Sequence, residues 1–518
     1  MSNEESYLDI SLRKVAKGAG IAFAGTFIGL ILAYFSRMVI ARWLGASDYG
    51  LICLGFTTMT IVAGLSLVGL PAAVKRHVSF YKGKEDAARI KGAIIGALEI
   101  SFPLSIIFAL ALFFSADWLS THIFHELNLT HVLRIFSLGI PFWALTNNFV
   151  SATVGFQDLR YRVYVNELFQ NTFKLIAIVA LLTSGFGVIG AAWGWVLAVM
   201  GMPFLAFYFL QKKVFPIFNT KTKAIPMKGE LLSFSWPLIF TTFAGLIMGY
   251  MDTLMLGYFS TAYSVGIYNA ALPTARVLGM GSGAFALIFL PVASELYARK
   301  REQDLKGIYT TVTKWILCIT LPGFLLMALF SDWIMRILFG SEFVVGAPAL
   351  SILAFSFFVS SLFGLSGSLL LVYERAKFVM CSSFAAAGAN FILNLLLIPI
   401  YGIKGAAIAT GISVFLGALL RFIFVFRIAR IHPFKKSYLK PVVASLLAVS
   451  IVYAVTKYVV GISTPSLIGM LFIFLALYFL LLLLFKSFEQ EDLMIMRAID
   501  QRLGTKSRWI RRIVQRFL

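Results

Sequence analysis

Charged residues are scarce in this chain of 518 residues: Asp, Glu, Lys and Arg make up 13% of it, whereas 60% is hydrophobic. A soluble protein of this length needs far more polar surface, so the composition excludes a soluble globular protein. Cysteine is also rare. The three cysteines lie inside apolar stretches without CxxC spacing, which excludes a disulfide framework and a thiolate metal site.

Catalytic signatures are missing as well. The sequence has no Walker A, GxSxG or HExxH motif, and no loop exceeds about 20 residues except at the termini. There is no room for a soluble catalytic domain, so we do not expect an enzyme or a cofactor. The segment HIFHELNLTH gathers His122, His125, Glu126 and His131. Histidines are common at membrane interfaces, and we assign no metal site.

Long apolar runs are abundant, and each is about long enough to cross ~30 Å of hydrocarbon as a helix. The runs are continuously apolar and do not alternate, which argues against a β-barrel. The sequence therefore predicts an all-α polytopic membrane protein, with a retained first span at 18–40. We expect fourteen spans: 18–40, 49–70, 92–114, 131–155, 165–184, 187–210, 232–256, 264–292, 308–330, 346–372, 379–399, 405–427, 441–458 and 465–485.

Most of the 45 Lys and Arg residues lie in alternate inter-span segments. This positive-inside pattern predicts a cell-membrane protein with both termini in the cytoplasm, and it explains most of the net charge of +22 without a nucleic acid partner. The terminal segment 506–518 places Arg residues opposite an apolar face. It is either a basic amphipathic helix on the membrane surface or a solvated tail.

Internal repeats divide the chain. GVIGAAWGWVLA at 187–198 is similar to GIKGAAIATGIS at 402–413, and GFQDLRYRV at 155–163 to VYERAKFVM at 372–380, at offsets of 215 and 217. We therefore expect two parallel six-helix lobes around a central cavity, at 1–217 and 218–434. Helices 13 and 14 would occupy 435–486, followed by a basic tail at 487–518.

A few charges lie inside the spans, where each costs roughly 2.5–3.5 kcal/mol on insertion scales. Arg276 is near the middle of span eight, Lys174 near the middle of span five, and Arg37 near the outer end of span one. Arginine binds phosphate oxygens through a planar fork, so a cationic lining for an anionic ligand is one interpretation. The alternatives are an Arg276–Asp252 ion pair and, for Arg37 and Arg134, extension of the side chain to the interface.

Span five has a polar stripe. Glu167, Asn171 and Lys174 recur at helical spacing, so this face is expected to meet protein or water and not lipid. A Glu167–Lys174 network that only joins helices would explain the same pattern. On the eighth span, Asn269 lies close to Arg276. Two other span charges, Lys314 and Arg421, are expected to extend toward the interface.

Two stretches carry a family resemblance. RMVIARWLGASDYGLICLG at 37–55 and MDTLMLGYFSTAYSVGIYNAA at 251–271 resemble the signatures of polysaccharide-biosynthesis flippases. These belong to the multidrug, oligosaccharidyl-lipid and polysaccharide exporter superfamily. The resemblance covers about residues 10–486 and implies two six-helix lobes that work by alternating access.

The same resemblance implies a function. Such flippases translocate oligosaccharides linked to polyprenyl pyrophosphate across the cell membrane for surface polysaccharide synthesis. Glycan polymerases or ligases would be their partners. In related flippases, arginines on the first and eighth spans contact the pyrophosphate, and Arg37 and Arg276 match these spans. We expect Arg276, Arg37, Lys174 and Arg134 to bind the substrate. The charge-positioning or cation-coupling residues would be Asp252, Glu167, Asn171 and Asn269.

Two other functions fit less well. A cation-coupled multidrug exporter of the same superfamily typically has twelve spans and acids buried in its first lobe, where this chain has only Glu99 and Glu167. A membrane glycan polymerase usually has a sizeable external loop, which this sequence lacks.

Overall fold

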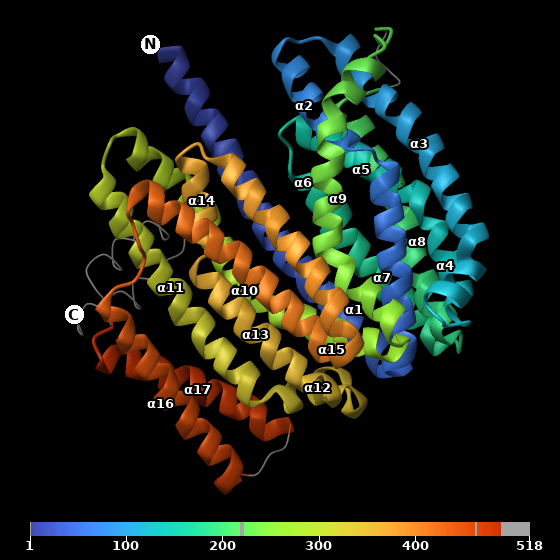
Figure 1. The fold of residues 1–518 in the computed structure, drawn as a ribbon. Coiled ribbons are helices and arrows are strands. Elements are labelled where there is room, and N and C mark those ends of the chain that lie inside the picture. The colour runs from blue at the N-terminus through green and yellow to red at the C-terminus, as the bar shows by residue number, and fades with distance from the viewer. Residues whose placement is uncertain (1, 218–221, 461–463, 488–518) are drawn as a thin grey trace. The chain divides into compact units, whose positions relative to one another are not determined.

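The computed structural model describes residues 2–217, 222–460 and 464–487, and the amphipathic segment predicted at 506–518 lies outside them. Over the described residues the chain is helical and has no strand. It forms two compact units, Met1–Asn269 and Ala270–Leu518 (Figure 1). The all-α membrane fold predicted from the sequence is confirmed.

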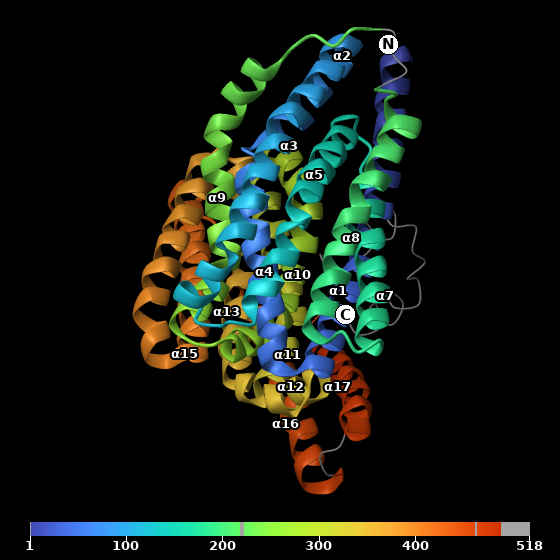
Figure 2. The ribbon, with the colours of Figure 1, turned by 90° about the vertical axis from the view of Figure 1, so that its right-hand side faces the viewer.

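In the N-terminal unit, α9 packs against α1, α2 and α3, while α8 packs against α5 and α7 (Figure 2). The lobe boundary expected at 217/218 follows the sequence repeat, whereas the compact unit extends through α9 to the start of α10. The helices are α1 (Ser2–Ser66), α2 (Leu70–Gly83), α3 (Ala87–Trp118), η1 (Leu119–Ile123), α4 (Leu129–Ser137), α5 (Gly139–Gly155), α6 (Arg160–Arg162), η2 (Val163–Phe169), α7 (Gln170–Thr183), α8 (Gly187–Phe209), η3 (Leu210–Val214), α9 (Lys228–Phe259) and α10 (Ala262–Ala298).

In the C-terminal unit, α13 packs against α11 and α15, and α16 packs against α11 and α17. An apolar core that includes Phe289, Tyr309 and Leu369 joins α10, α11 and α14. The helices after α10 are α11 (Glu302–Leu329), α12 (Ser331–Phe339), η4 (Ser341–Gly346), α13 (Ala347–Leu362), α14 (Leu365–Val372), α15 (Ala376–Ala429), η5 (Lys436–Tyr438), α16 (Leu439–Val455), η6 (Thr456–Val460) and α17 (Thr464–Leu484).

Two of the long helices each contain two predicted spans. α1 changes direction at Gly45 (φ 84°, ψ 179°) and α15 at Gly402 (φ 52°, ψ −124°). Both dihedral pairs are open to glycine because it has no Cβ. Eleven described helices are long and apolar enough to cross a membrane, and a shorter apolar stretch covers Gly469–Leu484. Counting both kinked helices twice and adding this stretch gives the fourteen spans predicted.

The internal repeat also appears in the packing. A Cβ on Gly190 would lie 3.3 Å from the carbonyl oxygen of Leu181, and one on Gly405 would lie 2.2 Å from that of Leu397. Each glycine lies where two successive spans of its own unit pack closely together. Corresponding positions of the two repeats therefore both use a glycine to allow close packing.

The last two helices are attached to α11 by polar as well as apolar contacts. Lys314, which is 3% exposed, donates from Nζ to the carbonyl oxygen of Ser487 at 3.1 Å, just beyond the end of α17. Lys440 donates to the carbonyl oxygen of Lys486 at 2.9 Å. Lys314, predicted to extend toward the interface, ends at the C-terminal end of α17, where the helix dipole favours a cation, and stays buried there.

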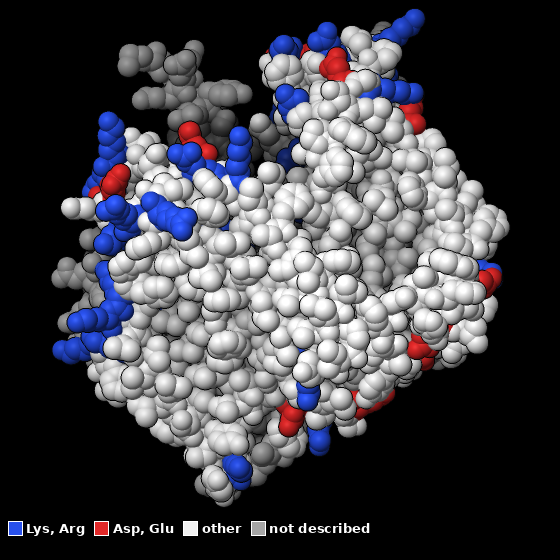
Figure 3. Space-filling model, viewed as in Figure 1, with Lys and Arg blue, Asp and Glu red and all other residues white. Residues whose placement is uncertain are grey.

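The surface is largely apolar. Figure 3 shows wide uncharged areas, with Lys and Arg gathered toward the margins of the view. Many large apolar side chains are exposed, among them Phe114 at 76% and Phe204 at 70%. Exposed apolar surface of this extent is unfavourable in water and suits a lipid environment.

Candidate functional site

Lys174 lies in α7 with only 4% of its surface exposed. Its Nζ donates to Oδ1 of Asn171 at 2.9 Å and lies 4.6 Å from the ring centroid of Trp195, on α8. An ammonium group carries three N–H donors, and only this one hydrogen bond is formed with described residues. The site therefore holds a buried cation with spare donor capacity.

Asn171 orients the lysine. Its Nδ2 donates to the backbone carbonyl oxygen of Glu167 at 2.8 Å, which leaves Oδ1 free to face Lys174. Glu167 is partly buried, and its backbone passes α1 so closely that a Cβ on Gly29 would lie 2.9 Å from the Glu167 carbonyl oxygen. Within the described chain, Glu167 and Lys174 form no ion pair. The structure thus brings Asn171 and Lys174 together, without the Glu167–Lys174 network that was the alternative explanation of the polar stripe.

Trp195 packs against the ammonium group of Lys174. The indole is 6% exposed, and its ring centroid lies 4.5 Å from that of Phe56 and 6.2 Å from that of Phe136. Its Nε1 has no acceptor among the described residues. A cation over an indole face is attracted by the ring quadrupole, which compensates in part for the absence of a carboxylate. Trp195 could not be predicted from the sequence, since a tryptophan in an apolar helix carries no distinguishing pattern.

Arg37 is the second cation near this site. It is partly buried in α1 and lies close enough to Lys174 for the two positive charges to interact. Among the described residues it forms no hydrogen bond or ion pair. Two like charges in a low-dielectric interior repel each other, so an anion between or beside them would be strongly favoured.

Asp252 and Asn269 join α9 to α10. The Tyr268 hydroxyl donates to Oδ2 of Asp252 at 2.7 Å, and both side chains are buried. Asn269 Nδ2 donates to Oγ1 of Thr253 at 3.1 Å and to the carbonyl oxygen of Val265 at 2.9 Å. These contacts fix the turn between the two helices and place a buried carboxylate about two helical turns before the end of α9.

The same region crosses α1 at very short range. A Cβ on Gly50 would lie 1.8 Å from the carbonyl oxygen of Ala262, and one on Gly266 would lie 1.9 Å from that of Ala46. The contact is reciprocal: each small-residue pair, Ala46 with Gly50 and Ala262 with Gly266, has the same four-residue spacing. Such pairs allow helix backbones to approach closely in membranes.

Arg276 lies farther along α10, in the C-terminal unit, and is exposed. It follows Pro273 by three residues and forms no hydrogen bond or ion pair with the described residues. A guanidinium in the interior of an apolar helix without a counter-ion is a candidate ligand group.

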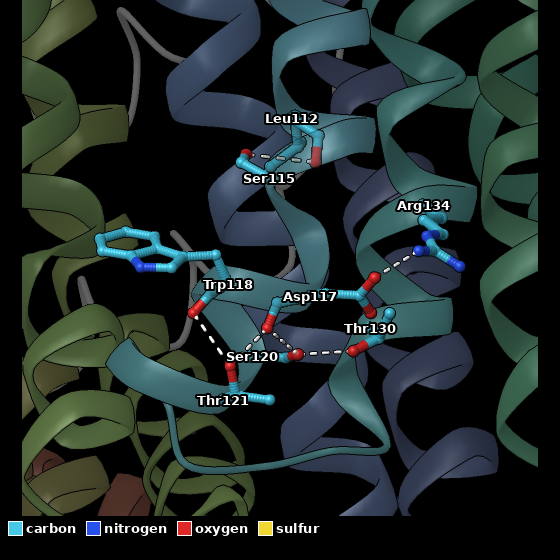
Figure 4. A network of polar contacts seen from close by, with 8 residues as sticks. All are labelled: Leu112, Ser115, Asp117, Trp118, Ser120, Thr121, Thr130 and Arg134. Atoms are coloured by element: carbon cyan, nitrogen blue, oxygen red, sulfur yellow. Dashed lines mark hydrogen bonds and ion pairs between the residues drawn. The ribbon is translucent and has the colours of Figure 1, made fainter.

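Arg134 differs from these cations because it already has a partner. Its Nη2 donates to Oδ2 of Asp117 at 2.6 Å across the end of α3, and both side chains are partly or largely exposed (Figure 4). Hydrogen bonds between Ser120 and Thr130 and between Thr121 and the carbonyl oxygen of Asp117 surround this pair. To bind a substrate, Arg134 would have to give up an ion pair that the sequence did not suggest.

The histidine-containing loop has a structural partner. Glu126 Oε1 accepts a hydrogen bond from the backbone N–H of Ala262 at 3.0 Å and so caps the first turn of α10. Over the described residues, no group of three His, Cys, Asp or Glu side chains is placed to hold a metal ion. The cap was missed because Glu126 and Ala262 are far apart in the sequence.

Comparisons with known proteins agree with this architecture. Residues 15–297 match the family described as polysaccharide biosynthesis protein, and residues 237–396 match MatE. The probable low-salt glycan biosynthesis flippase Agl15 of Haloferax volcanii is 25% identical over 398 residues, covering 76% of this chain and 79% of Agl15. Stage V sporulation protein B of Bacillus subtilis is 24% identical over 505 residues, covering 92% and 96% of the two chains.

A solved structure shows the same fold. The lipid II flippase MurJ in an inward closed conformation matches with a TM-score of 0.71 and 16% identity, over 91% of this chain and 99% of that one. The polysaccharide biosynthesis match alone spans more than half of the 518 residues. The chain is therefore a multi-pass, flippase-like membrane transporter, and it belongs to the polysaccharide biosynthesis protein family.

Proposed function

We propose that this protein translocates oligosaccharides linked to polyprenyl pyrophosphate across the cytoplasmic membrane, with both termini in the cytoplasm, for surface polysaccharide synthesis. The observation that carries the proposal is Lys174: a buried ammonium that forms one hydrogen bond and no ion pair with the described residues, close to the Arg37 guanidinium, which pairs with none of them. A bound diphosphate would supply the negative charge that balances these two cations.

These cations are suited to binding and release without bond cleavage. In the N-terminal unit Lys174 offers a compact charge and Arg37 a planar fork for phosphate oxygens, and in the C-terminal unit Arg276 offers another fork. Asn171 and Trp195 hold the Lys174 ammonium in place. The polyprenyl chain would remain in lipid while the diphosphate and sugars follow the cationic path.

Other residues would act indirectly. Asp252, bonded to Tyr268, and Asn269, bonded to Thr253, would fix the α9–α10 turn from which the helix bearing Arg276 continues. Asp252 would alternatively couple transport to a cation. The names of Agl15 and MurJ support the proposed substrate class, because both proteins are described as flippases. Glycan polymerases or ligases acting on the translocated product are the expected partners.

The test is translocation of a fluorescent polyprenyl-pyrophosphate-linked sugar in proteoliposomes. Arg276→Ala, Lys174→Gln and Arg37→Gln should each reduce the rate at least about tenfold, because each removes a charged hydrogen bond. Arg299→Gln is the matched control: Arg299 is exposed and pairs with Glu295 one turn away. Normal transport by well-folded Arg276→Ala protein would refute the assignment of this arginine.

A cation-coupled multidrug exporter is the second candidate, favoured by the MatE match at 237–396. Such a transporter would use acids to bind cationic drugs. Glu99, one of the two acids expected to be buried, is instead half-exposed and pairs with Lys228 at 2.6 Å. Drug efflux that persists in Lys174→Gln while glycan transport is absent would support this alternative.

A further inference from the structure

Arg421, in the C-terminal unit, is another arginine that forms no ion pair with the described residues. It is partly buried in α15, eight residues before the helix ends at Ala429. This part of α15 belongs to an apolar span in which a charged side chain is costly. Its place in the membrane therefore requires a source of stabilisation.

The orientation of Arg421 argues against a side chain that only reaches for the nearby interface. Its Nε donates to the carbonyl oxygen of Gly417 at 2.9 Å, one turn earlier in the same helix. The side chain therefore folds back, away from the near end of α15 at Ala429. A side chain that extends to the interface would point toward that end. The expectation from the sequence is wrong for this residue.

Two glycines leave room around the guanidinium. A Cβ on Gly367 of α14 would lie 3.5 Å from Nη1, and a Cβ on Gly417 would lie 3.4 Å from Nη2. Side chains at either position would cover the fork. Neither Nη1 nor Nη2 forms a hydrogen bond or ion pair with the described residues, so up to four N–H groups remain for a ligand.

Among its described residues, the C-terminal unit offers Arg421 no counter-ion. Its described acids lie in the terminal turns of helices or in the segments between them: Glu295, Glu302, Asp304, Asp332, Glu342 and Glu374. Two of them are already paired, Glu295 with Arg299 and Asp304 with Arg301. None of the six pairs with Arg421. The balancing negative charge must come from outside the described chain.

We propose that Arg421, between Gly367 and Gly417, forms a binding site for a lipid-borne phosphate. Lipid attachment is required because a free hydrated phosphate does not partition into the apolar region where this span lies. The planar fork accepts two oxygens of a phosphate or diphosphate. Both an anionic phospholipid and a polyprenyl pyrophosphate carry this group. The site lies in a different unit from Lys174 and goes beyond the proposed function.

The experiment measures binding to the full-length protein in detergent by native mass spectrometry. The probes are a short-chain polyprenyl pyrophosphate and phosphatidylglycerol, each titrated separately and then in competition. The Lys174→Gln background weakens binding to the cations of the proposed transport path. In that background Arg421→Gln should weaken binding about tenfold or more, and Arg421→Lys should weaken it less because the charge remains but the fork is lost. Arg427→Gln, an exposed position in the last turn of α15, should bind normally.

The two sources are distinguished by which probe depends on Arg421. If only phosphatidylglycerol binding is lost, the site binds a phospholipid. If only binding of the pyrophosphate probe is lost, the site is a second contact for a transported carrier. If Arg421→Gln fails to fold, Gly367→Leu covers the fork while keeping the charge and should produce the same loss. Unchanged binding of both probes to folded Arg421→Gln or Gly367→Leu would overturn the proposal. A phospholipid site at Arg421 would stand even if Lys174→Gln transported normally, so the two proposals fail separately.

Discussion

Gly50 of α1 and Gly266 of α10 meet so closely that neither position has space for a methyl group. The backbone contact lies between corresponding segments of the two repeats and brings α1 against the start of α10. Helix packing at this point is therefore set by the absence of side chains.

Replacing Gly50 or Gly266 by alanine should destabilise the protein by at least about 1–3 kcal/mol, since overpacking forces the backbones apart. Thermal unfolding followed by gel filtration would measure the loss. Gly229→Ala is the matched control, because a Cβ there meets nothing within 4 Å. Equal stability of all three variants would contradict the crossing described above.

Lys174→Met should separate function from stability. Replacing a buried charge by an apolar side chain of similar length is often neutral or stabilising, so the unfolding temperature should be unchanged or higher. Transport should nevertheless fall at least tenfold if the ammonium binds the substrate. A variant with lower stability and normal transport would indicate that Lys174 serves only to join α7 and α8.

The Tyr268–Asp252 hydrogen bond should contribute more than an ordinary one because its acceptor is a buried carboxylate. Tyr268→Phe is expected to cost about 1.5–3 kcal/mol. A double-mutant cycle with Asp252→Asn, measured by chemical unfolding, would isolate the pair. A coupling energy near zero would show that the carboxylate has an equally good alternative partner.

Glu126→Ala should loosen the beginning of α10 by removing its cap. Loss of a helix cap costs about 0.5–2 kcal/mol, and hydrogen exchange at 262–266 should rise accordingly. Glu126→Gln retains an acceptor and should show a smaller increase. Exchange that is unchanged in both variants would mean that another group satisfies the Ala262 amide.

Arg134→Gln provides a test of the remaining residue predicted to bind substrate. Its pair with Asp117 is partly exposed, so the expected loss of stability is at most about 1 kcal/mol. If the guanidinium is committed to Asp117, transport in proteoliposomes should stay within about twofold of normal. A tenfold loss would restore Arg134 to the substrate path.

The sequence was sufficient to predict the helical membrane architecture, because an apolar run of span length has few alternatives in lipid. It also placed Asn171 and Lys174 on one face of a helix. It did not predict that spans one and two are one kinked helix, because the dihedral angles that Gly45 adopts are not visible in composition.

The partners of individual charges were harder to predict. Lys174 meets Trp195, Glu126 meets Ala262 and Lys314 meets Ser487, and each pair is brought together only by helix packing. Hydropathy gives the depth of a residue along a span but not the direction in which its side chain points. The misjudged orientation of Arg421 has the same cause.

At Gly45 and Gly402 two successive helical segments are joined by a kink, without a loop between them. A tag, epitope or protease site inserted at either glycine would displace a whole transmembrane register instead of lengthening a surface loop. Labelling strategies for this transporter should therefore use the longer segments between α8 and α9 or between α15 and α16.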